Sequence, residues 1–173
     1  GVWRVVTHKE KIQLDLTAYQ GKNLQADLLR RDFAFNALAY PVSALPQVEV
    51  LPQKEGTAKI LLKRLKKNQI VDVSHGMQDV ADRVIDISHP RVFKEDPLRM
   101  LRAFRSSAEL GFSISPRTLA QIKKDAALIV QPAGERVHEE LERLFATSKA
   151  YENLMQMDGR HQVSCQRWTI RLY

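Results

Sequence analysis

Residues 92–105 constrain the fold more than any other stretch, because they combine a sharp helix start with a regular apolar stripe. Asp96 stands directly before Pro97, a pair typical of helix N-termini. The carboxylate can accept N–H groups of the first turn, and proline lacks an N–H that would go unpaired there. The pattern predicts a helix that begins at this pair and ends at a glycine cap, Gly111. Its apolar face is formed by Leu98, Leu101, Phe104 and Ala108.

The polar residues of this helix form the first candidate site. Asp96 and Arg99 are three residues apart, so both side chains can face the same space. Two simpler roles are open as well: Asp96 can serve only as the helix cap, and Arg99 can form a local ion pair with Glu95. The helix alone does not separate a binding role from a structural one.

Composition narrows the classes of protein. The chain has 173 residues and is 44% hydrophobic, enough for one or two small domains with a core. No apolar run is long enough to cross a bilayer, so we expect no membrane partner. Cys165 is the single cysteine, so no disulfide framework is possible, which favours a reducing, cytoplasmic setting. The five histidines lack the spacing of metal ligands. Lys and Arg number 27 against 20 Asp and Glu, a charge of +7 that suits a polyanionic partner such as RNA or a nucleotide.

The first half of the chain predicts short strands and short helices. Apolar and β-branched patterns indicate strands at residues 1–6, 12–17, 70–73 and 85–87, and a weaker one at 35–42. Short helices are expected in the front half of residues 24–40 and at 77–84. Two opening strands without an earlier neighbour make a marginal sheet. We therefore expect this part to be the back of a domain whose front lies outside the chain.

Residues 41–69 have the composition of a long insertion, with several prolines and a glycine. Ile60, Leu61, Leu62 and Leu65 favour a short helix or strand within it. The basic run at residues 63–67 either contacts RNA phosphates or forms a solvated face.

From residue 92 onward the pattern is helical. A helix is expected to open at Ser115 and Pro116, with Leu119, Ile122, Ala126 and Leu128 facing inward. Two more follow at 135–148 and 151–157, the first with Val137, Leu141, Leu144 and Phe145 facing inward. The apolar residues of 159–173 follow neither the helical nor the strand period, so we predict no helix or strand there. We predict an α+β chain in three parts: a mixed part at 1–90, an all-helical part at 91–158 and an unassigned tail at 159–173.

A second polar cluster lies in the mixed part. Two cations, an acid and an amide fall within seven residues, at Arg30, Arg31, Asp32 and Asn36. These side chains either build a binding site or form local ion pairs at a solvated helix end, where each pair contributes little.

Together these stretches resemble the class II nucleotidyltransferase family, which comprises tRNA CCA-adding enzymes and bacterial poly(A) polymerases. The family motif Arg-Arg-Asp-Phe-Thr-Ile-Asn-Ala-Leu is matched at residues 30–38 except at its Thr-Ile pair. The motif Glu-Asp-x-x-Arg, continued by Arg-Ala-x-Arg, is intact at 95–105, and Glu-Arg-x-x-x-Glu-Leu is matched at 135–141. The resemblance covers roughly residues 2–158. It implies that residues 1–90 are the C-terminal part of a nucleotidyltransferase head and that 91–158 are a helical neck that selects nucleotides and binds RNA.

The resemblance also implies roles for single residues. Asp96 and Arg99 would hydrogen-bond the Watson–Crick edge of the incoming base, and Arg102 would steady that pair. Glu135 and Arg136 would brace the neck helices. The ribose and the triphosphate would be faced by Arg30, Arg31, Asp32 and Asn36.

Departures from the family pattern bear on catalysis. The family's Gly-Gly-x-Val-Arg-Asp segment and the Asp-x-Asp that holds two Mg²⁺ ions have no counterpart in residues 1–173. Asp15 occupies the place of the family's third carboxylate, as metal ligand and catalytic residue, although an exposed strand acid explains it equally well. The family's Asp-Pro-Phe-Gly-Gly segment is also reduced at residues 72–76. One carboxylate cannot clamp two cations, so we expect this chain alone to be inactive.

The sequence therefore favours a fragment of an RNA 3′-end nucleotidyltransferase, which adds C and A residues to tRNA or A residues to RNA. Its expected partners are a tRNA or another RNA 3′ end, ATP, and CTP as a second nucleotide, with Mg²⁺ as the family's cofactor. Two alternatives stay open: a non-catalytic RNA- or nucleotide-binding module derived from that family, and a purely structural helical domain.

Overall fold

The computed structural model describes residues 2–6, 13–45, 48–52, 58–62 and 65–157. By their internal contacts the residues divide into two compact units. The first unit comprises residues 1–28 and 38–73, and the second comprises 29–37 and 74–173. These units differ from the division into residues 1–90 and 91–158 that the sequence predicts, and that division stays a prediction. The unassigned tail at 159–173 lies outside the described residues.

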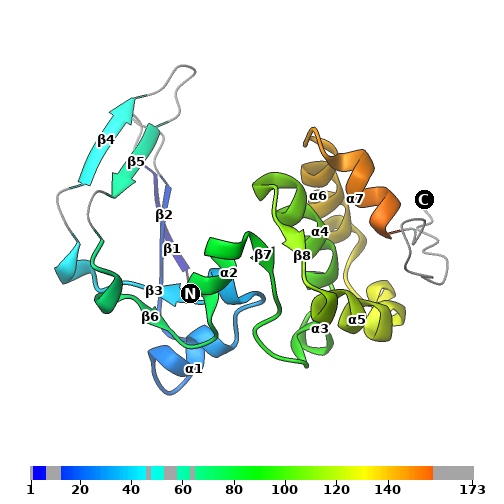
Figure 1. The fold of residues 1–173 in the computed structure, drawn as a ribbon, viewed down its shortest axis with the longest axis horizontal. Helices are drawn as coiled ribbons and strands as arrows, with labels where there is room; N and C mark the ends of the chain where they lie inside the picture. The colour runs from blue at the N-terminus through cyan, green and yellow to red at the C-terminus, as the bar shows by residue number, and fades with distance from the viewer. Residues whose placement is uncertain (1, 7–12, 46–47, 53–57, 63–64, 158–173) are drawn as a thin grey trace. The chain divides into compact units, whose positions relative to one another are not determined.

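The first unit consists of short antiparallel strand pairs (Figure 1). β1 (Val2–Val6) pairs with β2 (Gln13–Thr17), with Arg4 opposite Asp15. β3 (Leu38–Ala39) pairs with β6 (Val71–Asp72), and β4 (Val48–Pro52) pairs with β5 (Ala58–Leu62). The helix α1 (Leu24–Leu29) precedes β3 in the chain. Strands were predicted at both ends of this unit, and those predictions are confirmed.

Between residues 34 and 69 the structure differs from the prediction. The expected strand at 35–42 is reduced to β3, because the backbone first makes a 3₁₀ turn at Ala34–Asn36. Within the insertion, the choice between helix and strand resolves to strand β5, and its partner β4 was not predicted. Two further 3₁₀ turns lie at Val42–Ala44 and Lys67–Gln69. The β4–β5 pair depends on contacts between two strands, which the sequence pattern of either strand alone does not encode.

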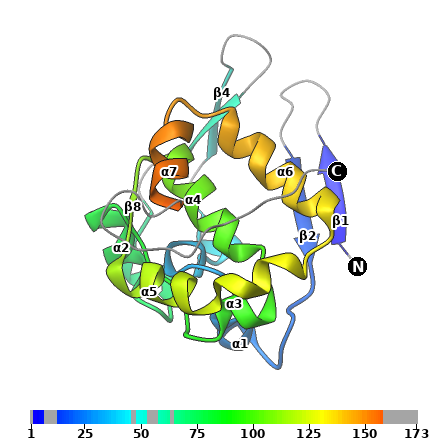
Figure 2. The ribbon, with the colours of Figure 1, turned by 90° about the vertical axis from the view of Figure 1, so that its right-hand side faces the viewer.

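The second unit is built around one central helix, α4 (Arg99–Leu110), which packs against α6 (Gly134–Phe145) and α7 (Ala150–Met157) (Figures 1 and 2). The strands β7 (Val84–Ile85) and β8 (Ser113–Ile114) pair in parallel. The remaining elements are α2 (Gly76–Asp82), α3 (Val92–Glu95), α5 (Pro116–Asp125) and a 3₁₀ helix at Ala126–Val130. The predicted α+β chain with a helical second part is confirmed.

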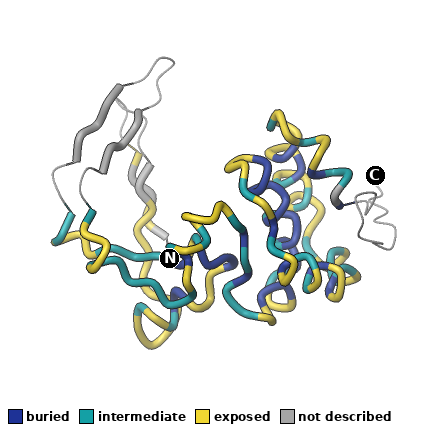
Figure 3. The backbone as a smooth tube through the Cα atoms, viewed as in Figure 1, coloured by how far each residue is buried: buried dark blue, intermediate teal, exposed yellow. Residues whose placement is uncertain are grey.

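Buried residues of the second unit gather along α4 (Figure 3). Met100, Leu101 and Phe104 are almost fully buried, and Leu141 and Leu144 of α6 belong to the same core. Phe145, predicted to face inward, is 55% exposed, so that prediction is wrong. It is the last residue of α6, and the buried stripe of that helix already ends one residue earlier.

The helix α4 ends where the sequence predicts but begins later than predicted. The regular helix begins at Arg99, three residues later than predicted, because Asp96 follows α3 in extended backbone and Pro97 and Leu98 form a turn. The Asp96 carboxylate still accepts the N–H of Leu98 at 3.2 Å, the type of bond expected of a cap. At the other end Gly111 has a φ of 69° and its N–H bonds the carbonyl of Ser107, as predicted.

No helix among the described residues combines the length and the apolar character needed to cross a membrane.

Candidate functional site

The segment that carries Arg30, Arg31, Asp32 and Asn36 is anchored in the core of the second unit by the residue that follows Asp32. Phe33 is fully buried, stacks on Phe35 with ring centroids 5.7 Å apart and forms a β-bridge with Ile87. Backbone bonds fasten the segment on both sides, because Ala34 N–H donates to the Asp86 carbonyl and Ser88 N–H donates to the Asp32 carbonyl. The Ser88 hydroxyl also donates to the Arg31 carbonyl. The segment therefore has a fixed place in this unit.

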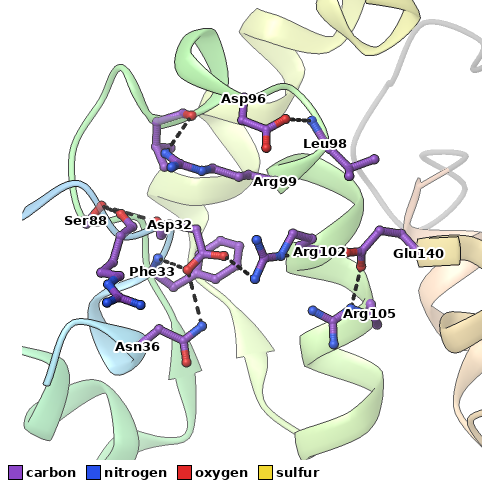
Figure 4. A network of polar contacts seen from close by, with 12 residues as sticks. Asp32, Phe33, Asn36, Ser88, Asp96, Leu98, Arg99, Arg102, Arg105 and Glu140 are labelled. Atoms are coloured by element: carbon purple, nitrogen blue, oxygen red, sulfur yellow. Dashed lines mark hydrogen bonds and ion pairs between the residues drawn. The ribbon is translucent and has the colours of Figure 1, made fainter. Parts of the chain in front are cut away.

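Asp32 is a buried acid with several partners, drawn in Figure 4. Its Oδ1 accepts the N–H of Phe33 at 3.0 Å and the side-chain amide of Asn36 at 3.3 Å. Its Oδ2 lies 3.1 Å from Nη2 of Arg102 on α4. A buried carboxylate needs such compensation, and Arg102 supplies the opposite charge. Asp32 and Arg102, which are 70 positions apart in sequence, thus link the Arg-Arg-Asp motif to the helix that carries the Glu-Asp-x-x-Arg motif.

Arg99 makes a second link between the same two motifs. Its Nη2 donates to the carbonyl of Arg30 at 3.0 Å. Its Nη1 lies 3.3 Å from both the Val92 carbonyl and the Glu95 carboxylate. The local pair with Glu95 that the sequence left open is therefore present, together with a long-range contact. The guanidinium is held from two sides, and the Arg99 side chain as a whole is 17% exposed.

Asp96 is held from two sides as well. Its Oδ1 accepts the N–H of Leu98, and its Oδ2 accepts a hydrogen bond from Nη2 of Arg136 on α6 at 2.7 Å. Its side chain stays 25% exposed. The structure therefore places Asp96 and Arg99 at the start of one helix, each with its own protein partners (Figure 4).

A cluster of ion pairs that joins α4 to α6 was not predicted. Glu140 of α6 lies 2.5 Å from Nε of Arg105 and 3.8 Å from Nε of Arg102, so that Arg102 stands between Asp32 and Glu140 (Figure 4). Arg105 is buried and also pairs with Glu109 at 2.6 Å. The sequence did contain Glu140, as the second glutamate of the Glu-Arg-x-x-x-Glu-Leu motif, but the spacing of a motif does not identify the partners of its side chains.

The remaining site predictions fall on different parts of the structure. Arg30, Arg31 and Asn36 are exposed beside the buried Asp32, in the same segment. Asp15 is exposed on β2 in the first unit. The roles of all these residues stay predictions, as does the basic run, of which residues 63 and 64 lie outside the described part.

A two-metal centre would need several carboxylate ligands close together among the described residues. Among them no group of three or more His, Cys, Asp or Glu side chains is arranged to hold an ion. Asp15, a single exposed carboxylate, does not by itself fit a two-metal centre, which needs several oxygen ligands. Mg²⁺ and the role of Asp15 as its ligand therefore stay proposals.

Two family models match the chain. The model described as the poly A polymerase head domain matches residues 3–86. The model described as the probable RNA and SrmB-binding site of polymerase A matches residues 111–161.

Individual proteins agree with these matches. The chain is 33% identical over 141 residues to a CC-adding tRNA nucleotidyltransferase of Halalkalibacterium halodurans, which covers 81% of this chain and 31% of that protein. It is 37% identical over 134 residues to a CCA-adding enzyme of Limosilactobacillus fermentum, covering 76% of this chain and 27% of that protein. The fold resembles the Bacillus stearothermophilus CCA-adding enzyme in complex with CTP, with a TM-score of 0.67, 27% identity, 89% of this chain covered and 35% of that one.

The chain spans about 30% of the length of the relatives that it matches. The matched part contains a partial head and a helical region, as the fold does. The three motifs, the two family models and the solved structure agree, and the chain belongs to the class II nucleotidyltransferase family of tRNA CCA-adding enzymes and bacterial poly(A) polymerases.

Proposed function

We propose that this chain is the nucleotide-selecting part of an RNA 3′-end nucleotidyltransferase that adds C and A residues to tRNA. One observation carries the proposal: the Glu-Asp-x-x-Arg motif, which would contact the base, and the Arg-Arg-Asp motif lie in the same compact unit. Arg99 bonds the Arg30 carbonyl and Arg102 pairs with Asp32. Groups suited to a base and groups suited to ribose and phosphate therefore occur on adjoining segments.

The chemistry of Asp96 and Arg99 favours C and A over U and G. Cytosine and adenine each present an exocyclic amine beside a ring nitrogen that accepts a hydrogen bond. A carboxylate accepts from the amine, and a guanidinium donates to the ring nitrogen. Uracil and guanine present the reverse order, a carbonyl and a ring N–H, so that each protein group meets a group of its own kind. An unmatched pair of this type costs binding energy.

The second motif would serve the rest of the nucleotide. Arg30 and Arg31 are exposed residues, and a guanidinium group suits phosphate oxygens, which arginine binds in a bidentate manner. Asp32 has both oxygens engaged by protein groups, but each carboxylate oxygen can accept more than one hydrogen bond. A ribose hydroxyl could therefore share it. The tRNA or other RNA acceptor, and the cytoplasmic setting, belong to the same proposal.

Transfer itself would require carboxylates and Mg²⁺ beyond the described residues. We therefore propose that this chain selects nucleotides and does not add them when present alone. Incubation of the chain with Mg²⁺, labelled CTP or ATP, and tRNA that lacks its CCA end should give no extension. Extension of that tRNA by the chain would refute the separation of selection from catalysis.

Nucleotide binding tests the selecting role directly. We expect the full chain to bind CTP and ATP in an NMR titration, with shifts concentrated around the start of α4. Arg99→Ala should abolish the saturable shifts. Arg99→Lys keeps the positive charge but loses the planar fork of donors, so it should bind no better than Arg99→Ala. Saturable binding that survives both substitutions, with the folded spectrum retained, would refute the role of Arg99.

A further inference from the structure

The helix α6 presents two charged residues to the candidate site from one face. Arg136 and Glu140 are four positions apart, a spacing that places both side chains on the same side of a helix. Arg136 contacts Asp96 at 2.7 Å, and Glu140 contacts Arg105 at 2.5 Å and Arg102 at 3.8 Å. Thus α6 reaches the acid that precedes α4 as well as the arginines within α4.

We propose that Arg136 is a positioning residue for base selection, which orients the carboxylate of Asp96 toward the incoming base. This inference rests on the proposed function. The last torsion of an aspartate side chain is only weakly restricted, so the helix start alone does not fix the plane of the carboxylate. Leu98 N–H on Oδ1 and Arg136 on Oδ2 define that plane together. Each oxygen keeps a lone pair that can accept from the amine of C or A.

The exposure of this pair separates a positioning role from a stabilising one. The Arg136 side chain is 52% exposed and that of Asp96 is 25% exposed. Ion pairs in such settings contribute little to stability because water screens them. Loss of Arg136 should therefore leave the fold intact while it frees the carboxylate to rotate. The consequence should appear as weaker discrimination between bases rather than as unfolding.

The chain offers a matched control on the same helix. Arg143 pairs with Glu109 at 3.1 Å, and its side chain is 58% exposed. This pair resembles Arg136–Asp96 in distance and exposure but does not involve Asp96 or Arg99. Arg143→Ala should therefore show what the loss of an exposed ion pair of α6 does by itself.

The test measures binding of CTP and UTP, one at a time, to the full chain and to Arg136→Ala, Arg136→Lys and Arg143→Ala. We expect Arg136→Ala to weaken CTP binding about fivefold to tenfold, the loss expected when a charge-assisted hydrogen bond is misdirected, with little change for UTP. Arg136→Lys should restore part of the preference, and Arg143→Ala should keep all of it. Thermal melting checks that the variants stay folded.

Each other outcome is decisive. An unchanged CTP-to-UTP ratio in Arg136→Ala would overturn the positioning role and leave the proposed function standing, provided that Asp96→Asn loses the preference. An equal loss in Arg143→Ala would overturn it too, because the effect would then follow from helix packing. Absence of any preference in the unaltered chain would overturn both the inference and the proposed function.

Discussion

Replacement of Glu140 by alanine should destabilise the second unit by about 2–3 kcal/mol. Glu140 is the partner of Arg105 at 2.5 Å, and the Arg105 side chain is only 8% exposed. Breaking a buried ion pair by removing one partner costs about 3–5 kcal/mol, because the other charge stays buried without compensation. The expected value lies at or below the lower end of that range, because Arg105 keeps a contact with Glu109 at 2.6 Å.

The matched control is Glu142→Ala on the same helix. The Glu142 carboxylate lies 3.1 Å from Nε2 of His138, and both side chains are about two-thirds exposed, at 66% and 64%. Its removal should change the free energy of unfolding by less than about 0.5 kcal/mol. Urea unfolding followed by circular dichroism at 222 nm reports mainly on the helices, which lie largely in the second unit. If Glu140→Ala proved as harmless as Glu142→Ala, the buried pair would not stabilise α4 against α6.

Two further substitutions test the packing of the second unit. Phe33→Ala removes a fully buried ring and should cost about 3–5 kcal/mol in urea unfolding, whereas Phe145→Ala, at a side chain 55% exposed, should cost less than about 1 kcal/mol; comparable losses would contradict the assigned core. Gly111→Ala forces a Cβ into left-handed backbone, at a φ of 69°, and should cost about 1–2 kcal/mol. Gly134→Ala, with open space around its Cβ, should be neutral or stabilising by up to about 1 kcal/mol. A loss at Gly134 as large as that at Gly111 would contradict the distinction.

The sequence predicts the helices of the second unit well because their signals are local. Ser115 accepts the N–H of Thr118 and caps α5, as the Ser-Pro pair indicates. Gly111 ends α4 for an equally local reason. The start of α4 was misplaced because α3 ends at Glu95, which makes Asp96 both the end of one helix and a cap for the next turn.

The contacts of the candidate site could not be predicted in the same way. Asp32 and Arg102 are 70 residues apart, and Asp96 and Arg136 are 40 apart. Each charge has several oppositely charged neighbours in sequence. The packing of α4 against α6 selects Arg136 as the partner of Asp96, and the anchoring of the segment 29–37 in the same unit selects Arg102 as the partner of Asp32. The motifs identified the residues, and the fold supplied their pairing.

The base preference of the unaltered chain tests the central claim most directly. Isothermal titration or NMR titration with CTP, UTP, ATP and GTP, each under the same conditions, would measure it. We predict that CTP and ATP bind more tightly than UTP and GTP, because Asp96 requires an amine and Arg99 requires an acceptor on the base. Equal affinity for all four nucleotides, or a preference for UTP or GTP, would contradict the claim that these two residues select the base.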